Sequence, residues 1–325
     1  MERCRRPPHV SGGGWLLTLS LYDNVMVINV QNLMNSAFGL RLGLVLGRLL
    51  IPHLGYALAD SVAAGLASRS DAPDVRAVRT NQQMLEYGRL SSTELEQRTR
   101  LVFQNAARGH YELFRSQHSV KAMLSQVELD SATLEYIRLT QAAERGIVFV
   151  APHTGNFDLA GRVLGHLGLN VQVLAEPTPR SDYQMQNEQR RRTGMNIIPI
   201  SYESLRTAAH HLKNGGSVLT GADWPVPGAR LRPVFCGRPS LMPTSHIRMA
   251  LQACAPVAVI ACHRLAQGKY QLASSDLITM QPAANPTESI LLNTQSVLAV
   301  VEQHIRQDPA HWLMFHQVWE DHEER

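Results

Sequence analysis

The chain has 325 residues, of which 44% are hydrophobic and 18% are charged. This composition excludes wholesale disorder, and the length fits one large α/β domain with a helical N-terminal extension. Basic residues outnumber acidic ones by 31 to 27, and most are arginine, which pairs well with phosphate. These residues are not interleaved with aromatic ones, so nucleic-acid binding is not predicted. The four cysteines form no CxxC pair and show no zinc-like spacing, so neither a metal nor a redox cofactor is predicted.

The first 70 residues are basic at their start and then strongly apolar. The apolar run at 15–21 is short and lacks a cleavage site, so a secretory signal is not expected. Within residues 38–50, Arg41 and Arg48 interrupt a leucine-rich run and share one helix face, and Pro52 should kink or end that helix. The run is too short for a clean membrane span. Two interpretations of residues 25–67 stand: an amphipathic helix in the membrane interface, or a buried helix with snorkelling arginines.

We therefore expect a membrane-associating region over residues 1–70, followed by an α/β domain over 71–325. Its lead-in, 71–145, is predicted to be helical. A turn at 71–74 starts one helix, and Ser91 and Glu94 have the spacing of a capping box at the start of the next.

Strands and helices alternate after Gly146. The β-branched and apolar runs predict strands at 147–150, 171–174, 196–200, 217–220 and 256–261. The segments between them predict helices at 159–167, 183–192, 204–213 and 247–253. This alternation is typical of an α/β fold with a mainly parallel central sheet flanked by helices.

The segment from His153 to Asp158 carries the most specific chemical pattern. His153 directly follows a predicted strand, where parallel sheets bind ligands, and Asp158 falls in the first turn of the next helix. A carboxylate beside an imidazole fixes its tautomer, and the imidazole can then remove a proton from a hydroxyl. The alternative is a strand-end histidine with Asp158 as a plain helix cap.

Several other polar residues follow predicted strands. Glu176 and Asp223 should point to the same rim as His153, where they would either bind substrate hydroxyls or cap the next segment. Thr154 and Gly155 would offer backbone N–H groups at a helix N-terminus to an oxyanion or a phosphate.

An arginine run and a C-terminal histidine complete the candidate residues. Arg190, Arg191 and Arg192 suit phosphate, although a solvated helix face is the usual meaning of such a run, and Arg180 is a weaker candidate. His316 follows Trp312 by four residues and would share one helix face with it, either shaping the pocket or serving structure.

Residues 151–161, APHTGNFDLAG, resemble the HX4D/E motif of the lysophospholipid acyltransferase superfamily. The core GNFD at 155–158 is similar to the branch of bacterial lipid A lauroyl/myristoyl acyltransferases and phosphatidylinositol mannoside acyltransferases, and DLAG at 158–161 leans towards the latter. Further segments resemble this branch in the same order: 175–176 with 190–195, 221–223, 234–239 and 309–320. Trp224, Cys236 and Ser240 depart from its pattern, which bears on the acceptor and acyl chain more than on the reaction.

The resemblance implies a glycerol-3-phosphate acyltransferase-like fold and transfer of a fatty acyl group to a hydroxyl of a membrane glycolipid. The donor would be acyl-CoA or acyl carrier protein, and the acceptor lipid A-like or phosphatidylinositol mannoside-like. His153 would be the general base and Asp158 would orient it. Residues expected to bind substrate are Thr154, Gly155, Asn156, Glu176, Arg190, Arg191, Asp223 and His316.

The expected location is the cytoplasmic face of the cell (inner) membrane, with peripheral or interfacially embedded attachment. Two alternatives remain. One is a lysophospholipid or glycerol-phosphate acyltransferase, although the Glu-Gly block of such relatives is not found. The other is a non-catalytic lipid-binding protein on the same fold.

Overall fold

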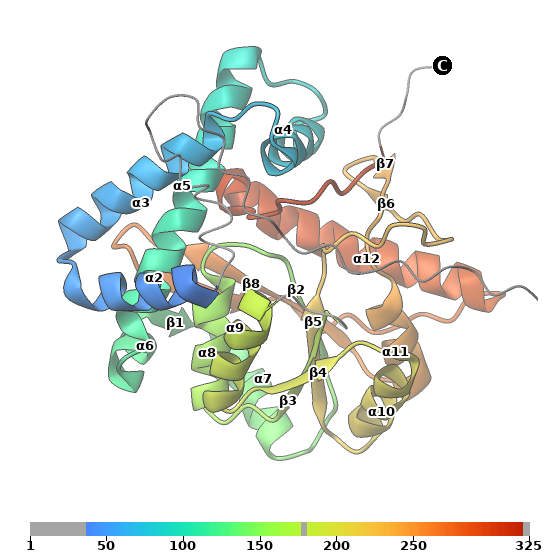
Figure 1. Ribbon diagram of the computed structural model, residues 1–325. Helices are drawn as coiled ribbons and strands as arrows, with labels where there is room; N and C mark the ends of the chain where they lie inside the picture. Colours follow the sequence, from blue (N-terminus) through green and yellow to red (C-terminus); the bar gives the residue numbers. More distant parts are fainter. Residues whose placement is uncertain (1–36, 177–180, 321–325) are drawn as a thin grey trace, which may run out of the picture.

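A computed structural model describes residues 37–176 and 181–320 (Figure 1). The expectations for residues 1–36, among them that this region is not a secretory signal, lie outside these residues. The candidate Arg180 lies outside them as well. The helices are α2 (Ala37–Leu49), α3 (Pro52–Ala67), α4 (Pro73–Leu85), α5 (Ser92–Ser116), α6 (Val120–Gln126), α7 (Ser131–Gln141), α8 (Phe157–His166), α9 (Ser181–Arg192), α10 (Tyr202–Lys213), α11 (Ser245–Ala253) and α12 (Pro286–Gln307). The strands are β1 (Val127–Leu129), β2 (Val148–Ala151), β3 (Val171–Ala175), β4 (Asn196–Pro199), β5 (Ser217–Gly221), β6 (Val234–Phe235), β7 (Arg238–Pro239), β8 (Val257–Arg264) and β9 (Tyr270–Ser274).

The central sheet has seven strands in the order β1-β9-β8-β2-β5-β3-β4. All neighbours are parallel except β8 and β9, which pair antiparallel. The predicted mainly parallel sheet is therefore confirmed, and each strand expected after Gly146 is present within a few residues. The sequence reasoning missed β1, β9 and α12, although α12 carries ordinary start signals: Asn285 caps the Glu288 N–H and Pro286 occupies the first turn.

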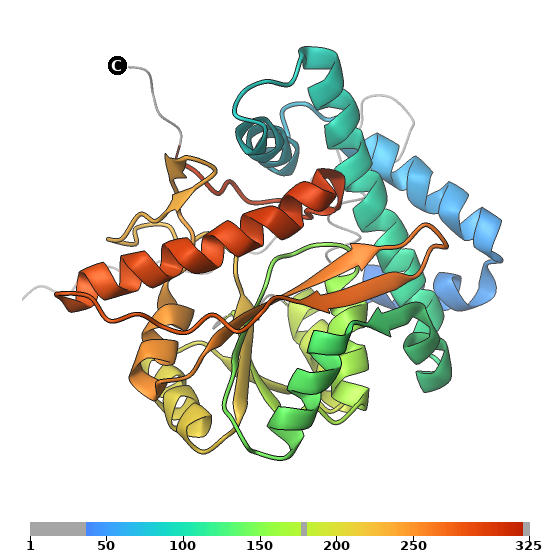
Figure 2. The same ribbon diagram turned by 180° about the vertical axis from the view of Figure 1, so that it is seen from behind.

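Alternating side chains of the central strand β2 divide the core into two layers. Val148 and Val150 pack with apolar residues of α10, α11 and α12. Phe149, which points the opposite way, packs with residues of α7 and α8. Figures 1 and 2 show the helices on both faces of the sheet. The sheet is thus buried on both sides, as expected for parallel strands, and its ends are left to carry a site.

The N-terminal helices α2 and α3 pack on the long helix α5. The Gly43 backbone lies so close to the Phe114 ring that an added Cβ would come within 2.5 Å of it. Asp60 of α3 forms two hydrogen bonds of 2.6 Å with Arg108 of α5. Pro52 begins α3, so the predicted break at this proline is confirmed. Among the described residues, no helix combines the length and the apolar character needed to cross a bilayer.

The outer side of α2 and α3 is apolar. Its exposed side chains are Leu42, Val45, Leu49, Ile51, Leu54 and Leu58. Arg41 and Arg48 are exposed next to them. Because the small residues face α5 and the leucines face outward, α2 and α3 are not the fully buried helices of the second interpretation.

Candidate active site

Two residues that are far apart in the sequence meet at the carboxyl end of the sheet. Strands β2 and β5 are parallel neighbours, and Ala151 is opposite Gly221 in their register. His153 and Asp223 each lie two residues beyond that pair, so the chain delivers them to the same place. Gly221 keeps this place open, because an added Cβ there would lie 3.3 Å from the His153 ring. The prediction that both residues share one rim is confirmed.

The Asp223 carboxylate is fully buried and holds the His153 imidazole. Oδ1 lies 2.6 Å from His153 Nδ1, and Oδ2 accepts hydrogen bonds from the His153 backbone N–H at 2.9 Å and from Trp312 Nε1 at 2.7 Å. A carboxylate can only accept, so Nδ1 donates, and in the neutral imidazole the lone pair is therefore on Nε2. The His153 side chain is 21% exposed, whereas Asp223 is 0% exposed. Asp223 therefore faces the imidazole, and the expected hydrogen bonds to substrate hydroxyls are not available to it.

Asp158 has different partners from those expected. Its Oδ1 accepts a hydrogen bond from Arg190 Nε at 2.7 Å, and Oδ2 lies 3.5 Å from Arg162 Nη2. Burial alone would raise the pKa of Asp158, but the charges of Arg190 and Arg162 outweigh it and lower the pKa below its ordinary value. The expected contact of Asp158 with His153 is thus replaced by an ion pair with α9, and Asp223 occupies the position beside the imidazole. The guanidinium of Arg190 is paired with the Asp158 carboxylate in this structure rather than directed to solvent, where a phosphate would bind.

The turn between His153 and α8 is held by the protein itself. Gly155 has φ +56°, and an added Cβ would lie 2.5 Å from the Cys262 carbonyl oxygen. Its N–H donates to the His311 carbonyl at 2.9 Å, and the Thr154 N–H donates to Pro152 at 2.8 Å. Asn156 caps α8 by accepting the Leu159 N–H at 3.2 Å. The N–H groups expected to bind an oxyanion are therefore already used, and these residues shape the motif rather than offer donors.

Aromatic rings surround the exposed edge of His153. Phe157 lies on one side with ring centroids 4.8 Å apart, and Trp224 on another at 5.7 Å. The exposed ring of His316 lies 4.3 Å from Trp224. The expectation that Trp312 and His316 share a helix face is wrong, because helical structure ends with the short turn Pro309–His311. In the extended segment that follows, Trp312 turns inward to Asp223 and His316 turns outward to Trp224.

The remaining candidates line a depression at the same end of the sheet. Its volume is about 360 Å³. The lining residues are Ala175, Glu176, Gln184, Asn187, Glu188, Arg191, Ile197 and Pro199. Glu176 follows β3, which is separated from β2 only by β5, or roughly 10 Å at the usual strand spacing. Glu176 and Arg191 are thus near His153 without touching it in this structure, and both are exposed to solvent.

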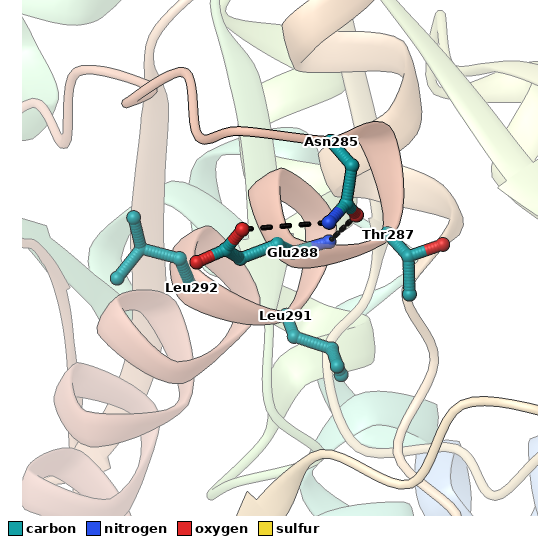
Figure 3. A pocket seen from close by; sticks show the side chains of 5 residues that line it. All are labelled: Asn285, Thr287, Glu288, Leu291 and Leu292. Atoms are coloured by element: carbon teal, nitrogen blue, oxygen red, sulfur yellow. Dashed lines mark hydrogen bonds between the residues drawn. The ribbon is translucent and has the colours of Figure 1, made fainter.

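A larger depression, of about 510 Å³, lies at the start of α12. Figure 3 shows its lining, where Asn285 and Glu288 are hydrogen-bonded to each other. The stretch from Leu292 to the end of α12 at Gln307 spans roughly 22 Å at the helical rise, and only beyond it does the chain reach His153. This depression therefore belongs to no part of the site around His153.

Two site residues were missed from the sequence. Arg162 could have been found, because it follows Asp158 by four residues and faces it on the same helix. Trp312 was noted only as a neighbour of His316. Its hydrogen bond to Asp223 spans 89 residues and depends on the extended path of the segment after α12, for which the sequence gives no local signal.

Comparisons with known proteins agree with the resemblance in the sequence. The family model described as bacterial lipid A biosynthesis acyltransferase matches residues 31–321. Two curated phosphatidylinositol mannoside acyltransferases of Mycobacterium tuberculosis strains are each 25% identical over 194 residues, which cover 57% of this chain and 58% of the relative. The chain thus matches a little more than half the length of these curated relatives.

Proposed function

The chain belongs to the bacterial lipid A biosynthesis acyltransferase family, and we propose that it transfers a fatty acyl group from a thioester to a hydroxyl of a membrane glycolipid. The donor is acyl-CoA or acyl carrier protein, and the acceptor is lipid A-like or phosphatidylinositol mannoside-like. The observation that carries this proposal is the buried Asp223 carboxylate at 2.6 Å from Nδ1 of a solvent-accessible histidine.

His153 is the general base in this mechanism. With Nδ1–H directed to Asp223, the lone pair of Nε2 is available for a substrate proton. No group among residues 37–176 and 181–320 forms a hydrogen bond with this Nε2. As the proton arrives, the negative charge of Asp223 stabilises the imidazolium, and the Trp312 N–H keeps the carboxylate from turning away. This is the arrangement by which an orienting carboxylate supports a histidine base in hydrolases.

The reaction then balances without a nucleophile from the protein. The acceptor hydroxyl oxygen attacks the thioester carbonyl carbon while its proton passes to His153 Nε2. The tetrahedral intermediate collapses with cleavage of the carbon–sulfur bond. The leaving thiolate takes the proton back from the imidazolium, so the products are an ester and a free thiol.

Asp158 takes part by positioning rather than by proton transfer. Its ion pair with Arg190 ties α9 to the first turn of α8, immediately after the turn that carries His153. Arg162, buried on the next turn of α8, adds a second positive charge. Because α9 also carries Arg191 and borders the depression with Glu176, this ion pair helps to position Arg191 relative to the base. We assign Arg191, which is exposed, to a phosphate of the donor or the acceptor.

The outer face of α2 and α3 fits attachment to a lipid surface. Exposed leucines beside Arg41 and Arg48 provide apolar insertion and attraction to anionic head groups. We therefore propose peripheral or interfacial attachment at the cytoplasmic face of the cell (inner) membrane. In flotation with anionic vesicles, Leu49→Glu with Leu54→Glu should abolish binding, and Leu134→Glu, which lies on α7, should not. Equal binding by all of these variants would refute attachment through the outer face of α2 and α3.

The reaction is tested with the purified full chain. Acyl-CoA and acyl carrier protein are offered as donors, with a phosphatidylinositol mannoside, a lipid A precursor, a lysophospholipid and glycerol 3-phosphate as acceptors. Mass spectrometry should show one added acyl chain on a glycolipid. His153→Ala should abolish it, and His210→Ala, an exposed histidine on α10, should leave it intact.

Three results would contradict the proposal. Full activity of folded His153→Ala would remove the mechanism. Transfer to the lysophospholipid or glycerol 3-phosphate alone would support the alternative of a lysophospholipid or glycerol-phosphate acyltransferase. Binding of acyl donor without turnover on any acceptor would support a non-catalytic lipid-binding protein.

A further inference from the structure

Trp224 is a large aromatic side chain left half in solvent beside the proposed base. It follows the fully buried Asp223 directly, and its side chain is 43% exposed. Its ring lies 5.7 Å from that of His153 and 4.3 Å from that of His316, measured between centroids. Exposing so much apolar surface has a cost in free energy, so a ligand that covers the ring would recover it.

The indole N–H of Trp224 differs from those of the buried tryptophans. Trp312 donates to Asp223 at 2.7 Å, and Trp319 donates to the Phe235 carbonyl at 3.2 Å. Within the part of the chain that the structure describes, no group accepts a hydrogen bond from Trp224 Nε1. Trp224 thus presents both an apolar ring face and a polar donor to whatever approaches His153.

The backbone that carries this ring is anchored on both sides. On one side, Asp223 is held by three hydrogen bonds from His153 and Trp312. On the other side, the Val226 N–H donates to the Leu241 carbonyl at 2.8 Å. These hydrogen bonds keep the backbone of Trp224 next to His153, and the ring contacts with His153 and His316 place the indole beside the base.

We propose that Trp224, backed by His316, is the platform on which a sugar ring of the acceptor stacks while its hydroxyl meets His153. This rests on the proposed function and specifies the acceptor. A pyranose has one face of C–H groups and an edge of hydroxyls, which match an indole face and its N–H. An acyl chain would use the face alone and would not need the neighbouring exposed imidazole of His316. Trp224 is therefore a specificity-determining residue.

The test compares two acceptors and two variants on the full chain. The acceptors are a glycolipid with one exposed hexose and a long-chain alcohol without sugar. Trp224→Ala should raise KM for the glycolipid roughly tenfold or more with a smaller change in kcat. Its kcat/KM for the glycolipid should fall much further than that for the alcohol. Trp224→Phe, which keeps a ring face, should retain most of the preference. Tyr202→Ala, at a site 88% exposed on α10, serves as the control.

Binding without turnover separates this proposal from the proposed function. A short-chain alkyl mannoside is titrated into each protein by calorimetry. Binding that Trp224→Ala weakens roughly tenfold supports the platform even if no acyl transfer occurs, in which case the proposed function fails alone. Equal losses on both acceptors, losses that follow the donor's chain length, or unchanged sugar binding would each overturn the platform.

Discussion

Asp223→Asn replaces one carboxylate oxygen at the proposed active site by an amide NH2 and leaves the shape nearly unchanged. Oδ2 of Asp223 accepts two N–H groups, from the His153 backbone and from Trp312, so the amide oxygen should take that position. The NH2 group then faces His153 Nδ1, formerly 2.6 Å from Oδ1. Nδ1 must become an acceptor, and the ring proton moves to Nε2, where it blocks the base.

The expected loss follows from the proton-transfer step. General-base catalysis by a positioned histidine contributes about 10²–10⁴-fold, and a forced wrong tautomer removes most of it. We therefore expect kcat for acyl transfer to fall by roughly 10²–10⁴-fold in folded Asp223→Asn. The KM values should change little, because Asp223 is fully buried and touches no solvent.

The matched variant is Asp158→Asn. It leaves the contact between His153 and Asp223 in place and removes the negative charge between Arg190 and Arg162. Breaking a buried ion pair costs about 3–5 kcal/mol, so Asp158→Asn should lower the free energy of unfolding rather than kcat of the folded protein. Initial rates with either thioester donor, normalised to the folded fraction from circular dichroism, separate the two effects.

The opposite ranking would refute this reasoning. If folded Asp158→Asn is inactive while Asp223→Asn keeps near wild-type kcat, the base is oriented by Asp158 and the described contacts do not represent the working state. A loss of activity in Asp223→Asn that tracks its folded fraction would make Asp223 structural only.

Three further predictions concern stability. Because Arg190 and Arg162 outweigh burial and lower the pKa of Asp158, the ionised Asp158 should stabilise the fold fully above pH 3.8, the ordinary pKa of an aspartate, and this stabilisation should be lost as the pH falls below 3.8. The urea midpoints of wild type and Asp158→Asn should therefore converge below pH 3.8, and a constant difference between them would contradict this. Burial lowers the pKa of His246 from 6.5 to about 4, so the unfolded chain takes up a proton first and stability should decline as pH falls from 6.5 to 4; His246→Leu should flatten that decline, and an unchanged slope would exclude His246 as its source. Gly155→Ala should lower the free energy of unfolding by more than the roughly 1–3 kcal/mol of backbone strain, because the added Cβ would also lie 2.5 Å from the Cys262 carbonyl oxygen. Gly228→Ala, at φ +74° with open space around the added Cβ, measures the backbone strain alone. Equal losses in the two variants would show that the clash with Cys262 does not occur.

Much of the fold follows from local patterns. The β-branched runs and the capping residues placed most elements of the parallel sheet, because strand and helix periodicities are written in neighbouring residues. Strand β1 was missed because an edge strand of three residues carries little pattern. Strand β9 was also missed, although it has five residues and pairs with both β1 and β8. The alternation of Val148, Phe149 and Val150 shows why β2 is apolar throughout: both faces of the strand are covered.

The sequence by itself determined the strand, the turn and the helix around His153, and with them a plausible base at the end of a sheet. It also placed Asp223 after another strand. Only the tertiary structure decided which carboxylate meets the imidazole. Strands β3 and β4 separate β2 from β5 in the sequence, yet β2 and β5 are direct neighbours in the sheet. The register of Ala151 with Gly221 therefore brings His153 and Asp223 together across 70 residues of chain. Asp158, although only five residues away, points to α9, because a helix turns its side chains by about 100° per residue and α9 supplies Arg190 on that side.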